Sequence, residues 1–174
     1  MVRGLRTSVF VGSSVDGFIA RPDGSFDWLT SGTSEPFDNG YSEFIATVDA
    51  LVIGRKTYEI VLGFERWFYE TKPVFVLSKR KISDKRVERL SGEPKEIVKE
   101  LAKRKLKNLY VDGGVTIQRF LAAGLIDRLI ITRVPVLIGE GIPLFGPVPH
   151  DIKLKHVATR TFKSGLVQTD YVVM

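Results

Sequence analysis

The chain has 174 residues and contains no cysteine, which excludes disulfides, thiolate catalysis and cysteine-ligated metals. Only two histidines are present, His150 and His156, and we expect a structural or surface role for both. No apolar stretch approaches the roughly 20 residues that cross a bilayer, and no signal-peptide core follows the cations among the first seven residues. We therefore expect a soluble, cytoplasmic protein that binds neither a membrane nor a metal.

Several signatures of nucleotide binding and catalysis are also missing: there is no Walker loop, no serine nucleophile elbow and no Rossmann fingerprint. The pair Gly139 and Gly141 looks similar to the Rossmann glycines, but it precedes Pro143, and Leu144 stands where a third glycine would be. The net charge of +6 favours phosphate-bearing partners. However, much of the excess lies between residues 79 and 107, in a pattern typical of a solvated helix face, and no nucleic-acid motif accompanies it. We do not expect nucleic acid to be a partner.

The length and the 44% apolar content predict one globular domain over residues 1–174. Strand patterns alternate with helix patterns through most of the chain. The strands are expected at 7–12, 50–53, 74–77, 87–90 and 108–111, and the helices at 41–47, 57–62, 94–105 and 115–123. A strand at 129–136 and a hairpin of 153–162 with 166–173 follow, whereas 13–39 and 139–146 are expected as loops. The pattern predicts an α/β fold with a mixed, mainly parallel sheet and a C-terminal antiparallel hairpin.

Four short polar pieces each follow an apolar run: 13–17, 54–57, 78–80 and 112–114. In an open α/β sheet, ligands bind outside the carboxyl ends of the strands. Glycines, hydroxyls and cations brought to one edge of a sheet favour a phosphorylated cofactor. The four pieces therefore predict a phosphate-binding edge.

The pieces differ in how strongly they indicate a ligand. Gly54-Arg55-Lys56-Thr57 opens a helix, where free N–H groups and the helix dipole favour an anion; the alternative is a turn with solvated cations. The glycines of Asp112-Gly113-Gly114 allow close approach of the backbone to a ligand, or they form a flexible turn. Ser78-Lys79-Arg80 is the weaker signal, because any surface turn can be basic.

Two aspartates are candidates for contact with a substrate. Asp16 lies in the loop after the first strand, where a carboxylate can orient or protonate a polar ligand; the alternative is a turn-forming Asp-Gly pair. Asp38 lies near the start of the helix predicted at 41–47, and its alternative role is an N-cap.

Together these segments resemble the dihydrofolate-reductase-like three-layer fold, in the branch that contains the reductase domain of riboflavin biosynthesis. The resemblance spans about residues 7–173. Ser14-Val15-Asp16-Gly17-Phe18-Ile19-Ala20 is similar to a riboflavin-reductase signature, and so are the segments 126–135 and 139–145. Val52-Ile53-Gly54-Arg55-Lys56-Thr57-Tyr58-Glu59 is similar to the Gly-Arg-x-Thr element with which dihydrofolate reductases bind NADPH phosphates.

The resemblance implies an NADPH site and assigns residues to it. At the adenosine 2′-phosphate end, the resemblance implies Gly54 and the residues Arg55, Lys56, Thr57, Ser78 and Lys79. Those implied along the pyrophosphate are Gly113, Gly114, Val115 and Thr116. The cations suit NADPH over NADH, because they offer charge to the extra phosphate.

For the substrate, the resemblance implies two different sets of contacts. Dihydrofolate reductases hold a pterin with a helix carboxylate and a strand threonine, which fall on Asp38 and Thr132, and Phe44 is a further predicted substrate contact. Riboflavin reductases feature the loop aspartate, here Asp16. We expect an NADPH-dependent reductase of a pyrimidine-ribosyl-phosphate or a related heterocycle, with pterin reduction as the alternative. A non-catalytic nucleotide or nucleic-acid binder is the alternative from another class, and a homodimer is expected by analogy.

Overall fold

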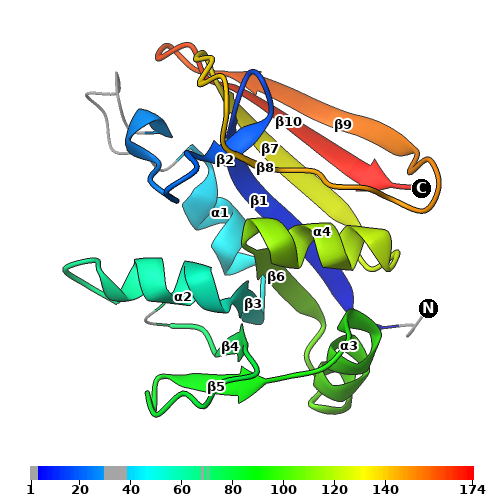
Figure 1. The fold of residues 1–174 in the computed structure, drawn as a ribbon. Helices are drawn as coiled ribbons and strands as arrows, with labels where there is room; N and C mark the ends of the chain where they lie inside the picture. The colour runs from blue at the N-terminus through cyan, green and yellow to red at the C-terminus, as the bar shows by residue number, and fades with distance from the viewer. Residues whose placement is uncertain (1–3, 30–38, 68, 70) are drawn as a thin grey trace.

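The structure, a computed structural model, describes residues 4–29, 39–67, 69 and 71–174. Its centre is an eight-stranded sheet in the order β5-β4-β3-β6-β1-β7-β10-β9 (Figure 1). The strands are β1 (Arg6–Ser14), β3 (Ala50–Gly54), β4 (Val74–Leu77), β5 (Val87–Leu90), β6 (Asn108–Asp112), β7 (Arg128–Val134), β9 (Leu154–Thr161) and β10 (Val167–Val173). The six strands from β5 to β7 in this order run parallel to one another. Strand β10 runs antiparallel to both of its neighbours, β7 and β9.

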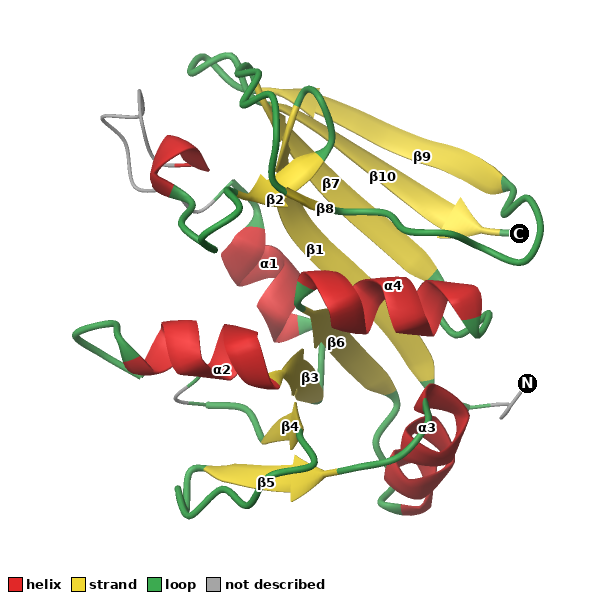
Figure 2. Ribbon diagram, in the orientation of Figure 1, coloured by secondary structure: helices red, strands yellow, loops and turns green. Residues whose placement is uncertain are grey.

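Helices pack on both faces of the sheet and create three layers (Figure 2). Alternate side chains of β1 belong to different cores: Val9 and Val11 join one, and Phe10 packs against the other. The helices α3 (Pro94–Lys103) and α4 (Gly114–Ala122) cover the first core, and α1 (Tyr41–Ala46) and α2 (Arg55–Leu62) cover the second. No helix within the described residues is long and apolar enough to cross a membrane.

The α/β class, the mainly parallel sheet and the C-terminal hairpin are confirmed. The predicted loops at 13–39 and 139–146 are partly wrong, because β2 (Phe18–Ala20) pairs there with β8 (Ile142–Pro143) in a separate two-stranded sheet. Strands of two and three residues are too short to show an alternating pattern. The loop at 13–39 also contains η1 (Asp27–Leu29), and β1 continues through the buried Ser13 and Ser14.

The parallel strands carry their following segments to one edge of the sheet. Residue Ile53 of β3 is in register with Asp112 of β6, and Gly54 is in register with Leu77 of β4. Because β3 leads directly into α2 and β6 leads into α4, the N-termini of these helices lie beside each other at that edge.

Candidate active site

Two strand-to-helix turns interlock at the carboxyl ends of β3 and β6. A Cβ added to Gly54 would lie 2.7 Å from the hydroxyl oxygen of Thr116, and one added to Gly113 would lie 2.5 Å from that of Thr57. Gly113 also has φ of 101°, a conformation that side chains rarely adopt. Each glycine thus leaves room for the threonine of the other turn, so both turns require glycine.

The interlock places two helix N-termini side by side, which suits an anion. Among the described residues, no side chain caps α2 at its N-cap Gly54 or α4 at its N-cap Gly113 by a hydrogen bond. Val115 is 66% exposed in the first turn of α4, whereas Thr116 is buried against the turn of α2. Of the residues predicted along a pyrophosphate, Val115 is thus exposed and Gly113 and Gly114 are half-buried. The Ile19 side chain lies beside Gly114, and Thr116 packs against the turn of α2.

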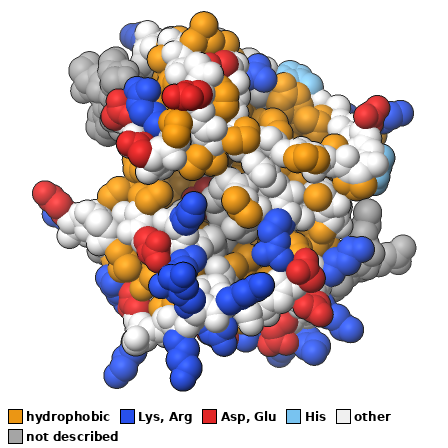
Figure 3. Space-filling model, in the orientation of Figure 1, with side chains coloured by type: hydrophobic (Ala, Val, Ile, Leu, Met, Phe, Trp, Pro, Cys, Tyr) orange, Lys and Arg blue, Asp and Glu red, His pale blue; other side chains and the backbone are white. Residues whose placement is uncertain are grey.

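A hydrogen bond joins α2 to the end of β4. Arg55 donates from Nη1 to Ser78 Oγ at 3.1 Å, and its Nε pairs with Glu59 Oε1 at 2.8 Å. Ser78 is buried, while Lys56 and Lys79 are exposed. The structure therefore brings two of the predicted 2′-phosphate residues, Arg55 and Ser78, into direct contact. Figure 3 shows Lys and Arg gathered on the half of this face that holds β4, β5 and α3.

The same view shows the surface hollowed between α2 and the segment above it (Figure 3). Asp112, the last residue of β6, lies at this edge of the sheet, partly accessible to solvent. Its Oδ1 accepts the Gly113 N–H at 2.8 Å. Burial raises the pKa of Asp112 to about 6, against the opposing effects of the Gly113 N–H and the Tyr110 hydroxyl. A carboxyl that gains and loses its proton near neutral pH suits acid–base chemistry.

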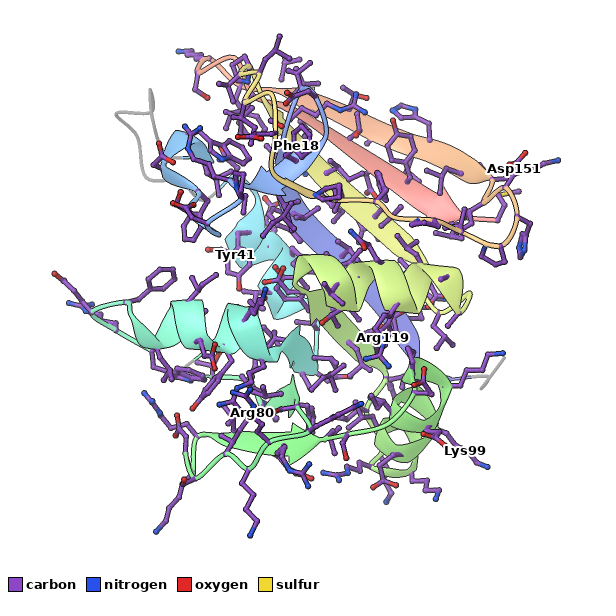
Figure 4. The ribbon with its side chains drawn as sticks, in the orientation of Figure 1. Phe18, Tyr41, Arg80, Lys99, Arg119 and Asp151 are labelled. Atoms are coloured by element: carbon purple, nitrogen blue, oxygen red, sulfur yellow. The ribbon has the colours of Figure 1, made fainter. Side chains whose placement is uncertain are left out.

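Tyrosines surround Asp112. Burial raises the pKa of Tyr41, Tyr69 and Tyr110, and the charge of Asp112 raises each of them further, which places all three near the carboxylate. The rings of Tyr41 and Tyr110 are 6.3 Å apart. Figure 4 shows Tyr41 at the start of α1. The carboxyl therefore lies in a largely aromatic setting.

Sequence reasoning treated Asp112 only as part of a Gly-rich turn. The sequence did contain one signal that could have marked Asp112 as a functional candidate: it is an acidic residue at the end of a buried apolar strand. Its raised pKa could not be foreseen, because the neighbouring tyrosines come from α1, from the segment after α2 and from β6 itself, which are far apart in the sequence.

Asp16 has a different environment. Its carboxylate accepts backbone N–H groups from Gly139 at 2.8 Å and Ile138 at 3.3 Å. The Ser14 hydroxyl, with these N–H groups, holds the pKa of Asp16 below its usual value. The side chain therefore stays ionised and braces the loop after β1 against the segment before β8. Its predicted role toward a substrate stays a prediction.

Asp38 lies outside the described residues, but the residue after it is anchored. Gln168 donates from Nε2 to the Asn39 carbonyl at 2.8 Å and to Thr132 Oγ1 at 2.9 Å. Thr132 is buried. The predicted strand threonine is thus linked through Gln168 to the start of the α1 segment, and its contact with a substrate stays a prediction.

Phe44 is a core residue of α1. Its ring lies 5.0 Å from Phe10 and 5.0 Å from Tyr110, and it is 5% exposed. The small space that it reaches is a pocket of about 240 Å³ between α1 and the strands β7, β10 and β9. Packing accounts for Phe44, so its predicted contact with a substrate remains a prediction without geometric support.

The order and directions of the strands, with helices on both faces of the sheet, define an α/β protein of the dihydrofolate-reductase-like class. The chain belongs to the RibD C-terminal domain family, whose model matches residues 8–168. This is a riboflavin-pathway reductase-like family. Among curated proteins, it is 36% identical over 171 residues to the uncharacterised Bacillus subtilis protein YwjB, covering 96% of this chain and 97% of that one.

Solved structures agree with this assignment. A candidate riboflavin biosynthesis protein from Shewanella sp. PV-4 is similar with a TM-score of 0.91 and 36% identity, over 98% of this chain and 99% of that one. A Thermotoga maritima deaminase/5-amino-6-(5-phosphoribosylamino)uracil reductase has a TM-score of 0.74 and 18% identity, over 99% of this chain and 57% of that one. Dihydrofolate reductase from Enterococcus faecalis, complexed with NADP(H), has a TM-score of 0.69 and 16% identity, over 97% and 96%. The last two show the fold alone.

The raised pKa of Asp112 predicts a change of stability with pH. The folded pKa of about 6 exceeds the ordinary aspartate pKa of 3.8, so the folded state loses stability as the pH rises between these values. Asp112→Asn removes the ionisation and can keep the Gly113 hydrogen bond. We expect the variant to melt at a higher temperature than the parent, with a gain that grows from about pH 4 to pH 6 and then levels off. Calorimetry across pH measures this, and a gain that is constant with pH would contradict it.

Proposed function

We propose that the chain is an NADPH-dependent reductase of a planar nitrogen heterocycle. The observation that carries the proposal is the contact of Arg55 with Ser78, made beside the interlocked turns of Gly54 and Gly113. It concentrates a guanidinium, a hydroxyl and two helix N-termini at one sheet edge. Membership of a reductase-like family supports the same proposal.

The residues present fit a phosphorylated dinucleotide. Glycine at positions 54 and 113 lets the two turns approach each other closely, and backbone N–H groups at the starts of α2 and α4 would hold the pyrophosphate. Arg55, Lys56 and Lys79 would hold the 2′-phosphate, which NADH lacks. When bound, NADPH supplies a hydride; the protein binds and orients the reactants.

Asp112 is the group best placed to move a proton. It ends the central strand β6 at the hollow, and part of its population is protonated near neutral pH. In the protonated form its hydroxyl donates a hydrogen bond to a ring nitrogen or carbonyl and delivers the proton that accompanies reduction. Asp16 and Asp38 remain proposed substrate contacts.

The substrate class follows from family and chemistry together. The reductase activity of the Thermotoga maritima protein makes an aminopyrimidine that carries a ribosyl phosphate the first compound to test. A pterin is the alternative, supported by the fold of dihydrofolate reductase. NADPH oxidation with each compound distinguishes them.

Removal of the Arg55 guanidinium should reduce cofactor discrimination. Arg55→Ala deletes a charge-assisted contact, so we expect NADPH affinity to fall about tenfold to a hundredfold and NADH affinity by less than about threefold. Fluorescence titration of both cofactors measures this, with the exposed Lys99→Ala on α3 as the control cation. Equal losses for the two cofactors would contradict the phosphate assignment. Steeply salt-dependent DNA or RNA binding without NADPH affinity would favour the nucleic-acid alternative.

Loss of the Asp112 proton should lower turnover while cofactor binding stays intact. Asp112→Asn cannot donate a proton, so we expect kcat to fall about a hundredfold or more with the dissociation constant for NADPH unchanged. In the parent, kcat should decline as the pH rises above about 6, because the carboxyl then ionises. A variant that keeps the parental kcat and pH profile would exclude Asp112 as the proton donor.

We further propose a homodimer formed through β9. All eight residues of this edge strand are exposed, among them Leu154 and Val157 at 41% and 53%. An exposed edge strand readily pairs with another strand. Light scattering should give a dimer for the parent and a monomer for Val157→Lys, with Lys163→Ala in the hairpin turn as control. A monomeric parent at about 50 μM would disprove the dimer.

A further inference from the structure

The turn after β4 is organised by Ser78, whose hydroxyl is fully engaged. Its Oγ accepts the Arg80 N–H at 3.0 Å and a hydrogen bond from Arg55 Nη1 at 3.1 Å, and it donates to the Arg80 carbonyl at 3.0 Å. Since a hydroxyl has one donor and two acceptor positions, this one is satisfied before any ligand binds. Ser78 is therefore better suited to hold Arg55 in place than to contact a phosphate itself. Figure 4 labels Arg80 in this turn, between α2 and β5.

A second guanidinium is fixed at the same serine. Arg89 of β5 donates from Nη1 to the Ser78 carbonyl oxygen at 3.1 Å. The strand register explains this contact, because Arg89 is in register with Val76 of β4, and Val76 packs in the core that α2 covers. Side chains alternate between the two faces of a sheet, so Arg89 lies on the α2 face. It thus approaches Ser78 from the same face as Arg55.

The two guanidiniums differ in how their charges are balanced. Arg55 forms an ion pair with Glu59 at 2.8 Å. In the part of the chain that the structure describes, no acid forms an ion pair with Arg89, and its neighbour Glu88 pairs with Arg104 at 2.7 Å instead. Arg89 is also exposed to solvent. It therefore places an uncompensated positive charge beside the compensated charge of Arg55.

This arrangement suits a phosphate monoester. A guanidinium has five N–H donors, and the contact with Ser78 uses only one of the two Nη1 donors of Arg89. The terminal oxygens of a phosphate monoester accept hydrogen bonds from two guanidiniums, and its double negative charge exceeds what one cation balances. The exposed Lys79 and Arg80 directly follow Ser78 and add to the positive potential.

We infer that Arg89 binds the 2′-phosphate of NADPH together with Arg55, and that Ser78 is a positioning residue that holds both guanidiniums. This inference rests on the proposed reductase function and deepens it, because it assigns the preference for NADPH to a pair of arginines from α2 and β5. The hydroxyl of Ser78 holds Arg55, and its carbonyl oxygen holds Arg89.

Removal of Arg89 tests the phosphate contact. In Arg89→Ala we expect NADPH affinity to fall about tenfold or more and NADH affinity to change by less than about twofold, because only NADPH carries the 2′-phosphate. Arg89→Lys keeps the charge but not the planar fork, so its loss should be intermediate. Lys85→Ala, an exposed cation in the turn before β5, is the control and should leave both affinities unchanged. Fluorescence titration of each cofactor measures the affinities. A parental preference for NADPH in Arg89→Ala, or equal losses for both cofactors, overturns the inference.

Double variants separate binding from positioning. Arg55→Ala combined with Arg89→Ala should bind NADPH and NADH about equally, since neither guanidinium remains. Ser78→Ala should lower NADPH affinity in the parent, but it should cause no further loss in Arg55→Ala, because the hydroxyl acts through Arg55. A further loss specific to NADPH in that background would mean that the hydroxyl contacts the phosphate directly, which overturns the positioning role. Thermal melting of each variant verifies that it is folded.

The same titrations keep this inference distinct from the proposed function. A parent that prefers NADPH, with an Arg89→Ala variant that shares the preference, overturns only the role of Arg89. A parent that binds no NADPH overturns the proposed function, and the inference with it.

Discussion

The close approach of two backbone turns, at Gly54 and Gly113, is the constraint on which the candidate site depends. Each glycine accommodates the threonine hydroxyl of the other turn. This contact fixes the start of α2 against the start of α4 and aligns the ends of β3 and β6. Arg55 reaches Ser78, and Asp112 is held at the edge, because the helices begin at these positions. A side chain at either glycine would separate the turns and displace all of these groups together.

Asp112 illustrates a conflict between stability and chemistry. Burial among tyrosines disfavours its charge, and the Gly113 N–H compensates only in part, so the pKa rises to about 6. For folding alone, a neutral amide would suit the position better, since it could accept the same hydrogen bond. Groups that break a local rule without a packing benefit are expected at functional sites. The carboxyl therefore supports a chemical role more strongly than the exposed Asp16, whose hydrogen bonds account for it.

The sequence predicted the elements whose signals are local. Strand β4 is a short apolar run after Pro73, and α3 begins at Pro94 with a capping box between Glu93 and Glu96; both were found where expected, although α3 ends two residues earlier. The pairing of β2 with β8 was missed, because it joins segments more than a hundred residues apart. The grouping of the phosphate-binding residues could be inferred from strand ends. The proton affinity of Asp112 could not, since it arises from neighbours brought together only by folding.

The two sides of the hollow rest on different kinds of structure, and this explains why they can specialise separately. On the side proposed for the cofactor, the candidate contacts are backbone N–H groups and glycines that cannot be changed without moving β3 against β6. On the other side, the acids Asp23 and Asp27 lie on exposed turns outside that contact. Their charges can change without disturbing the interlocked helices. The glycine turns therefore constrain the side proposed for the cofactor, whereas the exposed turns that carry Asp23 and Asp27 can vary in charge.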